Sequence, residues 1–315
     1  MKTLVIHTGG TIGMVQTQMG YAPELGIVED CLNELHSQGR IEGQYDLVVS
    51  DPLIDSANAS PKDWNWITSQ IEKNYDNYNA FMITHGTDTL SFTTSALSFA
   101  LEGLGKPVVV TGSMLPLTVQ HNDGLGNLTD AMNAALRAEA GVWVQFAGQL
   151  LHGTRVRKSH STAFDAFHAS PTNLPPKRDG DSFRVQQFGE YDIPVLAVAP
   201  GMSGSVAEYC AARANGIVLR CYGSGTLPEI PGLYTALELA AKREIPVVAV
   251  SQCSEGGISL GTYAAGAILK DAGVIDGRDA TVEASYAKLM YALSKFSTPK
   301  AQFEFLERSA CGEFS

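Results

Sequence analysis

The 315-residue sequence predicts an α/β protein built from two α/β domains. Short apolar runs alternate with longer segments of helical pattern, as in proteins with parallel sheets. The alternation stops between Ser170 and Pro194, where prolines, charges and short polar runs have the composition of an exposed linker. It restarts at Val195. We therefore predict a larger N-terminal catalytic domain with a mainly parallel sheet (1–176), a linker (177–194) and a smaller C-terminal parallel-sheet domain (195–315).

Each element of the first domain has its own local signal. Ser60 suits a helix N-cap, Pro61 the first helical position and Asp63 the first turn, which predicts a helix over 61–75. Another helix follows the turn at 84–89 and ends near Gly103 and Gly105. The remaining elements are strands at the apolar runs 3–8, 45–50, 80–84 and 107–111, a helix over 125–139, and two consecutive strands within 142–154.

The second domain repeats the pattern on a smaller scale. Its predicted strands are 195–200, 216–223 and 245–253, and its predicted helices are 203–213 and 232–242.

Composition narrows the class of function. The formal net charge is −11, which disfavours binding to nucleic acid or to an anionic membrane surface. The five cysteines are scattered without a C-x-x-C pair, so neither a disulfide framework nor a zinc site is expected. The apolar run at the N-terminus is too short for a signal-peptide core, and no run reaches the length of a membrane helix. We expect a cytoplasmic protein.

Two glycine turns flanked by threonines are the first candidate site. Thr8–Thr11 and Thr84–Thr89 both follow predicted strands, and ligands of parallel sheets bind beyond the carboxyl ends of strands. Glycines at a strand end also have a purely conformational explanation, because they permit positive φ. A phosphate-binding module is disfavoured, since no Lys-Ser/Thr pair follows the first turn and G-x-G-x-x-G is missing.

The residue types in these turns suit amide chemistry. A threonine hydroxyl needs a base before it can attack an amide. Lys158 could act as that base if burial beside other cations removed its proton, although an ordinary solvated loop lysine is the alternative. Asp88 lies between two threonines and is not an ordinary surface charge. His7 and His85 invite a triad interpretation, but histidines at strand ends more often bond the backbone or neighbouring side chains.

At this point the sequence resembles the bacterial L-asparaginase family. The resemblance rests on TGGTIGM (8–14), THGTDTL (84–90), KPVVVTGSMLPL (106–117) and KSHSTAFDAF (158–167), and later on SQCSEGGISLGTYAAG (251–266) and AGVIDGRDATVEASYAKLMYAL (272–293). The PLIDS run (52–56) and the missing signal peptide make the chain more similar to the cytoplasmic type I branch than to the secreted type II branch. The resemblance implies hydrolysis of L-asparagine to L-aspartate and ammonia.

It also implies a role for individual residues. Thr11 would be the nucleophile, with Tyr21 as its partner on a lid formed by residues 13–26. Thr87, Asp88 and Lys158 would form a second catalytic group, while Ser56 and Asp88 would hold the carboxylate and ammonium of the substrate. Neither a cofactor nor a metal is required. Ala57 stands where the secreted branch usually has glutamine.

Two rival functions stay open. A broader glutaminase-asparaginase would differ only in tolerating one more methylene, and a non-catalytic amino-acid sensor would keep the binding turns. The resemblance further implies a homodimer or homotetramer.

The resemblance also bears on regulation. Arg220 and Cys253 match positions of an allosteric asparagine site in type I relatives. Arg157, however, replaces a small polar residue beside the catalytic lysine, and its guanidinium is poorly compatible with an incoming ammonium group. We therefore expect Arg220 and Cys253 to be remnants of that site and the kinetics to be hyperbolic.

Overall fold

The computed structural model describes residues 1–262 and 266–315, which form two compact units, Met1–Gln187 and Phe188–Ser315. Residues 263–265, part of the SQCSEGGISLGTYAAG segment, lie outside the described residues. The division falls within the stretch predicted as a linker. Part of that stretch belongs to the first unit, because strand β12 (Arg184–Val185) pairs with β6 (Leu101–Glu102). A linker role for 177–194 stays a prediction.

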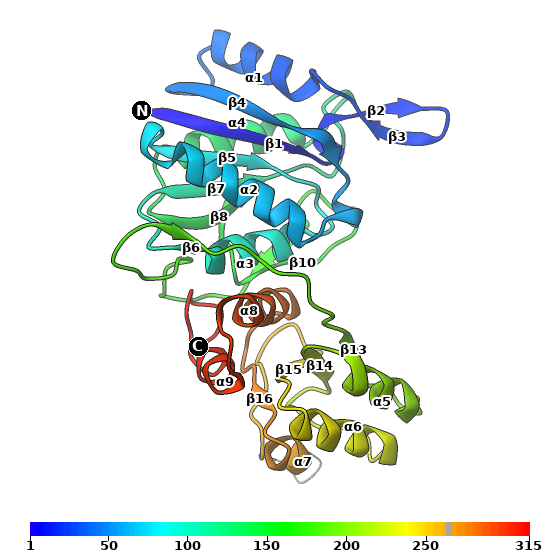
Figure 1. The fold of residues 1–315 in the computed structure, drawn as a ribbon. Coiled ribbons are helices and arrows are strands. Elements are labelled where there is room, and N and C mark those ends of the chain that lie inside the picture. Colours follow the sequence, from blue (N-terminus) through cyan, green and yellow to red (C-terminus); the bar gives the residue numbers. More distant parts are fainter. Residues whose placement is uncertain (263–265) are drawn as a thin grey trace. The chain divides into compact units, whose positions relative to one another are not determined.

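A six-stranded sheet forms the centre of the first unit (Figure 1). All neighbouring strands are parallel apart from the last pair, which is antiparallel. The predicted fold class is therefore confirmed for this unit. In spatial order the strands are β4 (Gln44–Ile54), β1 (Lys2–Gly9), β5 (Ala80–Thr84), β7 (Pro107–Thr111), β8 (Gly141–Phe146) and β9 (Gln149–His152).

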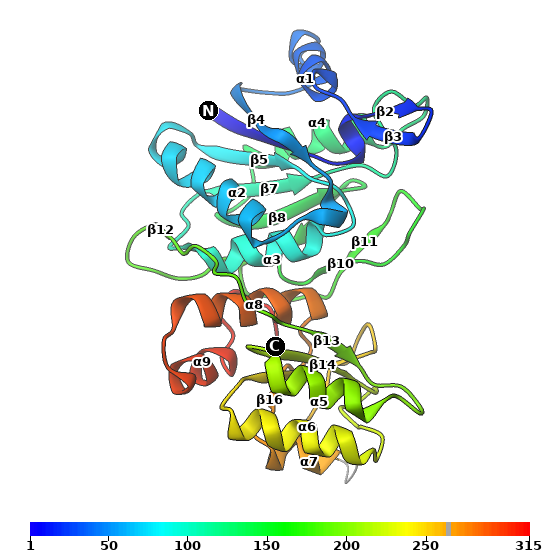
Figure 2. The ribbon, with the colours of Figure 1, turned by 45° about the vertical axis from the view of Figure 1, so that its right-hand side comes forward.

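Helices cover both faces of this sheet, as Figures 1 and 2 show. Side chains alternate between the two faces of a strand, so neighbours on β1 enter different cores. Val5 packs in a cluster with residues of α1 (Ile27–Ser37) and α4 (Gly124–Ala135). Leu4 packs instead in a cluster with residues of α2 (Pro61–Asn74) and α3 (Leu90–Ala100). The buried strands therefore read as continuous apolar runs in the sequence.

Most element boundaries follow the predicted signals closely. The α2 helix begins at Pro61, with the Asp63 carboxylate accepting from the Ser60 backbone N–H at 2.7 Å and from its hydroxyl at 2.9 Å. The α3 helix ends at Ala100, earlier than the expected region of Gly103, because the next residues pair as β6. The α4 helix is also shorter than predicted.

Strand order fixes where a ligand can enter the first unit. Strand β4 lies on one side of β1, and β5, the next strand of the main sheet in the chain, lies on the other side. The direction of winding therefore reverses at β1. In open parallel sheets, ligands bind beyond the carboxyl ends of strands at such a reversal. The two threonine-bearing turns follow the strands on either side of this reversal: Thr8–Thr11 lies at the end of β1, and Thr84–Thr89 lies at the end of β5.

The second unit contains a smaller parallel sheet, as predicted. Its strands are, in order, β13 (Val195–Ala197), β14 (Ile217–Cys221), β15 (Val247–Ser251) and β16 (Ile275–Asp276), and its helices are α5 (Gly204–Arg213), α6 (Pro231–Lys242), α7 (Ala267–Asp271), α8 (Val282–Lys295) and α9 (Pro299–Leu306). The α5 and α6 backbones approach closely because both carry glycine at the contact: a Cβ at Gly204 would lie 2.8 Å from the Gly232 Cα. No helix among the described residues is long and apolar enough to span a membrane.

A buried ion pair fastens the end of the chain to α8. The Lys288 ammonium lies 2.8 Å from the Glu313 carboxylate, and their side chains are 4% and 0% exposed. Glu313 also accepts hydrogen bonds from the backbone N–H groups of Ala310 and Cys311, while Lys288 donates to the Leu306 carbonyl at 2.9 Å. Each charge is thus surrounded by partners, which offsets the cost of removing it from water.

We predict that Glu313→Gln lowers the free energy of unfolding of the second unit by about 3 kcal/mol, because it leaves the Lys288 charge buried without its carboxylate. Far-UV circular dichroism during urea unfolding measures the loss. Glu304→Gln is the matched control, since its partner Lys300 lies 3.9 Å away and both side chains are exposed; such pairs contribute about 0–1 kcal/mol. Equal losses in the two variants would contradict the prediction.

Candidate active site

Three turns meet at the carboxyl ends of β4, β1 and β5. A Cβ at Gly10 would lie 2.5 Å from the Gly86 backbone nitrogen, and a Cβ at Gly86 would lie 2.3 Å from the Ser56 hydroxyl oxygen. Only glycine fits at either position. Gly10 also has φ 90° and ψ 172°, a conformation essentially reserved for glycine. The two glycines thus bring Thr11 and Thr87, which follow them in the sequence, to the same site as Ser56.

Lys158 joins this site from a separate hairpin. It ends β10 (Val156–Lys158), which pairs with β11 (Phe167–Ala169). Its ammonium donates to the Thr87 hydroxyl at 2.9 Å and to the Asp88 carboxylate at 2.8 Å. Thr87 is buried, whereas the Lys158 and Asp88 side chains are 21% and 63% exposed. The three residues therefore form a connected group that a ligand can reach.

The surroundings of Lys158 differ from those suggested by its sequence context. The charged partner that it contacts is the Asp88 carboxylate rather than another cation. Arg157 precedes Lys158 on β10, and successive side chains of a strand point to opposite faces. The cations of the TRVRKSH stretch are thus not gathered on one side.

Ser56 lies in a short 3-10 helix, η2 (Ser56–Asn58), directly after β4. The Asp55 carboxylate accepts from the Ala57 backbone N–H at 3.1 Å and fixes the start of this turn. The Ser56 side chain faces Gly86, and the residue is only 5% exposed. Ala57 is exposed.

Thr11 begins another 3-10 helix, η1 (Thr11–Gly13), and is half-buried. Thr8, three residues earlier, has a different position: its buried hydroxyl donates to the Thr84 carbonyl at 2.7 Å. Thr8 therefore fastens the ends of β1 and β5 together, and Thr11 is the threonine of this turn that is partly open to solvent.

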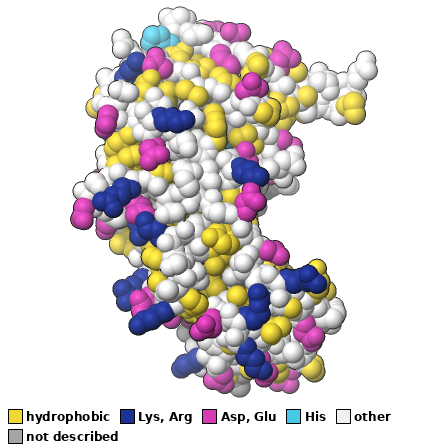
Figure 3. All heavy atoms as spheres, in the orientation of Figure 1, with side chains coloured by type: hydrophobic (Ala, Val, Ile, Leu, Met, Phe, Trp, Pro, Cys, Tyr) yellow, Lys and Arg dark blue, Asp and Glu magenta, His cyan; other side chains and the backbone are white. Residues whose placement is uncertain are grey.

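Tyr21 lies on a hairpin rather than in an irregular loop. Strand β3 (Gly20–Pro23) pairs with β2 (Met14–Thr17), which sets Tyr21 opposite Gln16. Figures 1 and 3 show the hairpin projecting from the rest of the first unit. Tyr21 is 47% exposed, and its role as partner of Thr11 stays a prediction.

The two histidines beside the turns are structural in this conformation. His85 Nδ1 donates to the Gly86 carbonyl at 2.8 Å, and its Nε2 lies 3.0 Å from the Thr93 hydroxyl. Burial lowers the pKa of His85, which favours the neutral ring, and a neutral ring can make both bonds by accepting from Thr93 at Nε2. His7 Nδ1 bonds the Thr84 hydroxyl at 2.6 Å, and burial lowers its pKa as well, with Glu29 opposing the shift.

A fourth turn, residues 112–115 after β7, borders the site; its segment contributed to the family resemblance, but none of its residues was predicted to belong to the site. A Cβ at Gly112 would lie 2.3 Å from the His85 carbonyl and 3.7 Å from a Thr87 methyl carbon. The Asp123 carboxylate accepts from the backbone N–H groups of Met114 and Leu115 at 2.8 and 3.0 Å. Asp123 stands directly before α4, where a capping carboxylate is common, and that position is the signal that could have identified it.

Arg220 and Cys253 lie in the second unit, at and just beyond the carboxyl ends of β14 and β15. The Arg220 guanidinium donates to the Gln252 carbonyl at 3.1 Å, and the Cys253 side chain is exposed. Arg157 belongs to the first unit.

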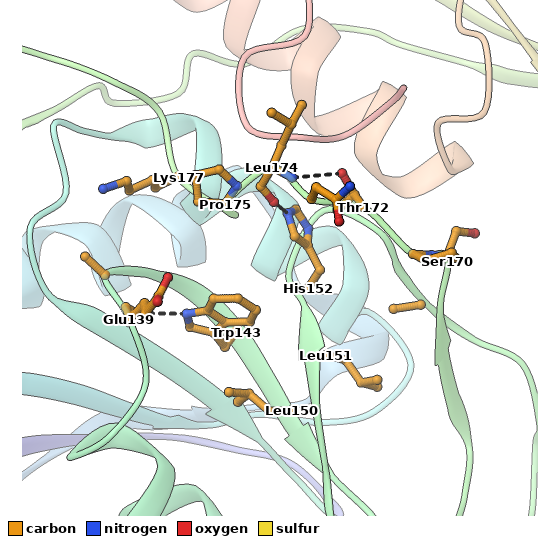
Figure 4. A pocket seen from close by; sticks show the side chains of 14 residues that line it. Glu139, Trp143, Leu150, Leu151, His152, Ser170, Thr172, Leu174, Pro175 and Lys177 are labelled. Atoms are coloured by element: carbon orange, nitrogen blue, oxygen red, sulfur yellow. Dashed lines mark hydrogen bonds between the residues drawn. The ribbon is translucent and has the colours of Figure 1, made fainter.

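A pocket of about 530 Å³ lies elsewhere in the first unit (Figure 4). Trp143 and Leu150 line one side of it, and His152 and Leu174 line the other. It adjoins Glu139 and Ala140, which precede β8, whereas the turns described above follow the carboxyl ends of parallel strands. Two ring nitrogens in the wall of this pocket already bond backbone carbonyls. Trp143 Nε1 donates to the Glu139 carbonyl, and His152 Nε2 lies 3.1 Å from the Leu174 carbonyl.

Comparison with known families covers nearly the whole chain. Residues 2–187 match the family described as asparaginase, N-terminal, and residues 192–305 match the glutaminase/asparaginase C-terminal domain. The chain belongs to the asparaginase family. The resemblance inferred from the sequence motifs is thereby confirmed.

Individual asparaginases resemble the chain over nine tenths or more of their length. L-asparaginase 1 of Escherichia coli K12 is 38% identical, over 92% of this chain and 91% of that protein. L-asparaginase of Thermococcus kodakarensis is 36% identical over 100% of this chain and 99% of that protein. The crystal structure of L-asparaginase I from Vibrio cholerae superposes with a TM-score of 0.87 at 34% identity, covering 100% of this chain and 99% of that one.

We predict that Gly10→Ala destabilises the first unit more than Gly20→Ala does. Both glycines have positive φ, but a Cβ at Gly20 has nothing within 4 Å, whereas one at Gly10 meets the Gly86 backbone. Overpacking typically costs about 1–3 kcal/mol beyond the conformational penalty. Urea unfolding followed by tryptophan fluorescence measures the difference, because all three tryptophans lie in this unit. Equal losses would show that conformation alone requires glycine at position 10.

Proposed function

We propose that this asparaginase-family chain hydrolyses L-asparagine to L-aspartate and ammonia. The observation that carries the proposal is the Thr87–Lys158–Asp88 group beside the Gly10–Gly86 contact, at the point where the sheet reverses its winding. The similar proteins from E. coli, T. kodakarensis and V. cholerae are named L-asparaginases, which supports the same reaction class.

Substrate binding follows from the charges of an amino acid. A buried ammonium needs a carboxylate, and a buried carboxylate needs hydroxyl or backbone donors, because an unpaired charge is costly away from water. In the proposed complex Asp88 accepts from the substrate ammonium. Ser56, held against Gly86, donates to the substrate carboxylate.

Catalysis is proposed to start at Thr11. Its hydroxyl oxygen attacks the carboxamide carbon, with Tyr21 as its partner once the hairpin closes. Backbone N–H groups of the glycine turns stabilise the negative charge that develops on the carboxamide oxygen; one such donor is typically worth about 3 kcal/mol. The C–N bond then breaks, and ammonia leaves with the proton that the Thr11 hydroxyl gave up on attack. The resulting ester between Thr11 and aspartate is hydrolysed by water, which restores the threonine.

The second group handles protons in this scheme. Lys158 contacts the Thr87 hydroxyl directly, so the two can pass a proton between the reacting atoms and the lysine. Asp88 holds the lysine at hydrogen-bond distance from Thr87. The scheme uses no metal or cofactor.

Selectivity and regulation are parts of the same proposal. We propose asparagine as the preferred substrate. Glutamine is the comparison to measure, because one methylene in a pocket changes the discrimination by only about 1–3 kcal/mol. We also propose that Arg220 and Cys253 are remnants of an effector site, that the chain forms a symmetric dimer or tetramer, and that it is cytoplasmic. The resemblance to type I enzymes supports the oligomer and the compartment, and Arg157, in place of a small polar residue, supports the loss of the effector site.

Thr11→Ala and Thr87→Ala are each expected to lower kcat/KM for asparagine by at least about a thousandfold while leaving the fold intact, because both side chains lie in turns. Lys158→Met is expected to be nearly as damaging, since it removes the ammonium and keeps most of the aliphatic stem. Ammonia release from asparagine and glutamine, measured side by side, gives the rates.

Thr129→Ala is the control for these variants. Its hydroxyl donates to the Leu125 carbonyl at 2.7 Å within α4, so it loses a hydrogen bond away from the turns. Circular dichroism checks the fold of every variant. Activity within tenfold of wild type in both Thr11→Ala and Thr87→Ala would rule out the two-threonine mechanism.

The β2–β3 hairpin is expected to be a lid that closes over bound substrate. Among the residues that the structure describes, the hydrogen bonds from the neighbouring turn reach its base: the Leu117 N–H donates to the Ile12 carbonyl at 3.2 Å and the Thr118 hydroxyl to the Met14 carbonyl at 3.1 Å. Hydrogen exchange with and without aspartate should therefore show ligand-dependent protection of residues 14–24. The β8–β9 turn around Gly148 serves as the control. Equal protection of residues 14–24 in both states would count against a lid.

A further inference from the structure

Thr89 occupies a helix-capping position without capping its helix. It is the N-cap residue of α3, yet its side chain makes no hydrogen bond to the first turn. Its hydroxyl donates instead to the Ser56 backbone carbonyl at 2.8 Å, across 33 residues of sequence. A helix start is thus left without its usual side-chain partner in favour of a contact with another turn.

Two threonines in the second unit show the ordinary behaviour. Thr281 and Thr298 are the N-cap residues of α8 and α9, and each accepts a hydrogen bond from a backbone N–H of the first turn, at 3.0 and 3.4 Å. Thr89 has the same residue type and helix position, but its backbone differs: ψ is 14° at Thr89, against 160° at Thr281 and 140° at Thr298. The Thr89 backbone thus departs from the extended N-cap conformation, and its hydroxyl is directed to the Ser56 turn instead.

The bond holds Ser56 from a second side. Gly86 contacts the Ser56 side chain, and Thr89 of the same turn binds its carbonyl. The Ala59 N–H, at 3.2 Å, is another donor to this carbonyl, and it comes from within the Ser56 turn. Thr89 therefore fixes Ser56 relative to Thr87 and Asp88, which lie two and one residues before it.

We propose that Thr89 is a positioning residue, which sets the Ser56 hydroxyl in register with the Thr87–Asp88 turn for binding the α-carboxylate of the substrate. The inference rests on the proposed function, because it takes Ser56 as the carboxylate donor. Thr89 acts through Ser56 and does not touch the reacting carboxamide. Its loss therefore weakens binding in the ground state and the transition state alike, which raises KM and leaves kcat nearly unchanged.

The primary test compares Thr89→Val with Thr89→Ser. Valine keeps the shape and removes the donor, whereas serine keeps the donor. We expect KM for asparagine to rise about tenfold in Thr89→Val, with kcat within about threefold of wild type, because the loss of one hydrogen bond carries up to about this factor. In Thr89→Ser, KM should stay within about twofold of wild type. Thr129→Val is the matched control, because it removes a hydroxyl-to-carbonyl bond of 2.7 Å on α4.

A double-variant cycle tests whether Thr89 acts through Ser56. If it does, Thr89→Val adds no further rise in KM when Ser56→Ala is already present, because the group being positioned is gone. Additive effects would show that Thr89 supports the site by another route and would overturn the proposal. A fall in kcat at unchanged KM would do the same, since it would place the effect at Thr87 or Asp88.

Binding of L-aspartate by titration calorimetry separates this inference from the proposed reaction. Wild-type protein that bound aspartate but released no ammonia would refute the hydrolysis, while weaker aspartate binding in Thr89→Val would still support the positioning role. Equal aspartate affinity in wild type and Thr89→Val would refute the positioning role alone. If Thr89→Val fails to fold by circular dichroism, Thr89→Ala removes the donor without a branched side chain and answers the same question.

Discussion

The contact between the Gly10 and Gly86 backbones is the constraint on which the rest of the candidate site depends. Two parallel strands end side by side, and the turns after them touch because neither residue carries a Cβ. Each turn can then place its next residue, Thr11 or Thr87, near the contact. Larger residues at positions 10 and 86 would separate the two turns, and the two hydroxyls could no longer serve one small substrate as proposed. The lack of a Cβ at positions 10 and 86 thus sets the distance between the two turns.

Around this contact, polar groups are used across turns more than within them. Thr8 and His7 both bond Thr84 at the neighbouring strand end, and Thr89 bonds the Ser56 carbonyl. Helix starts and strand ends usually satisfy such groups locally, and departures from local rules are expected where a site must be held in shape. The α3 helix loses the stabilisation of a side-chain cap in return, because no side chain of its N-cap residue bonds its first turn.

The sequence predicted the sheet and the chemistry better than the connections. Strand β5 and the start of α2 follow directly from an apolar run and from the Ser60-Pro61 signal, because these depend on neighbouring residues. The β2–β3 hairpin was expected as a loop, since its pairing depends on register between segments with little apolar alternation. Thr89 and Asp123 stand in recognisable capping positions, but their actual partners follow from tertiary packing that sequence spacing does not encode.

The residues that hold the base of the hairpin and the turn beside Thr87 belong to one stretch of chain, 112–118. Leu117 and Thr118 hold the hairpin at Ile12 and Met14, while Asp123 holds Met114 and Leu115, only a few residues away. Movement at the hairpin base would therefore pull on a loop that is pinned next to the Thr87 turn. In the proposed mechanism, closing of the hairpin and the shape of the wall beside Thr87 would then be mechanically linked, so that entry of substrate and alignment of the carboxamide would form a single motion.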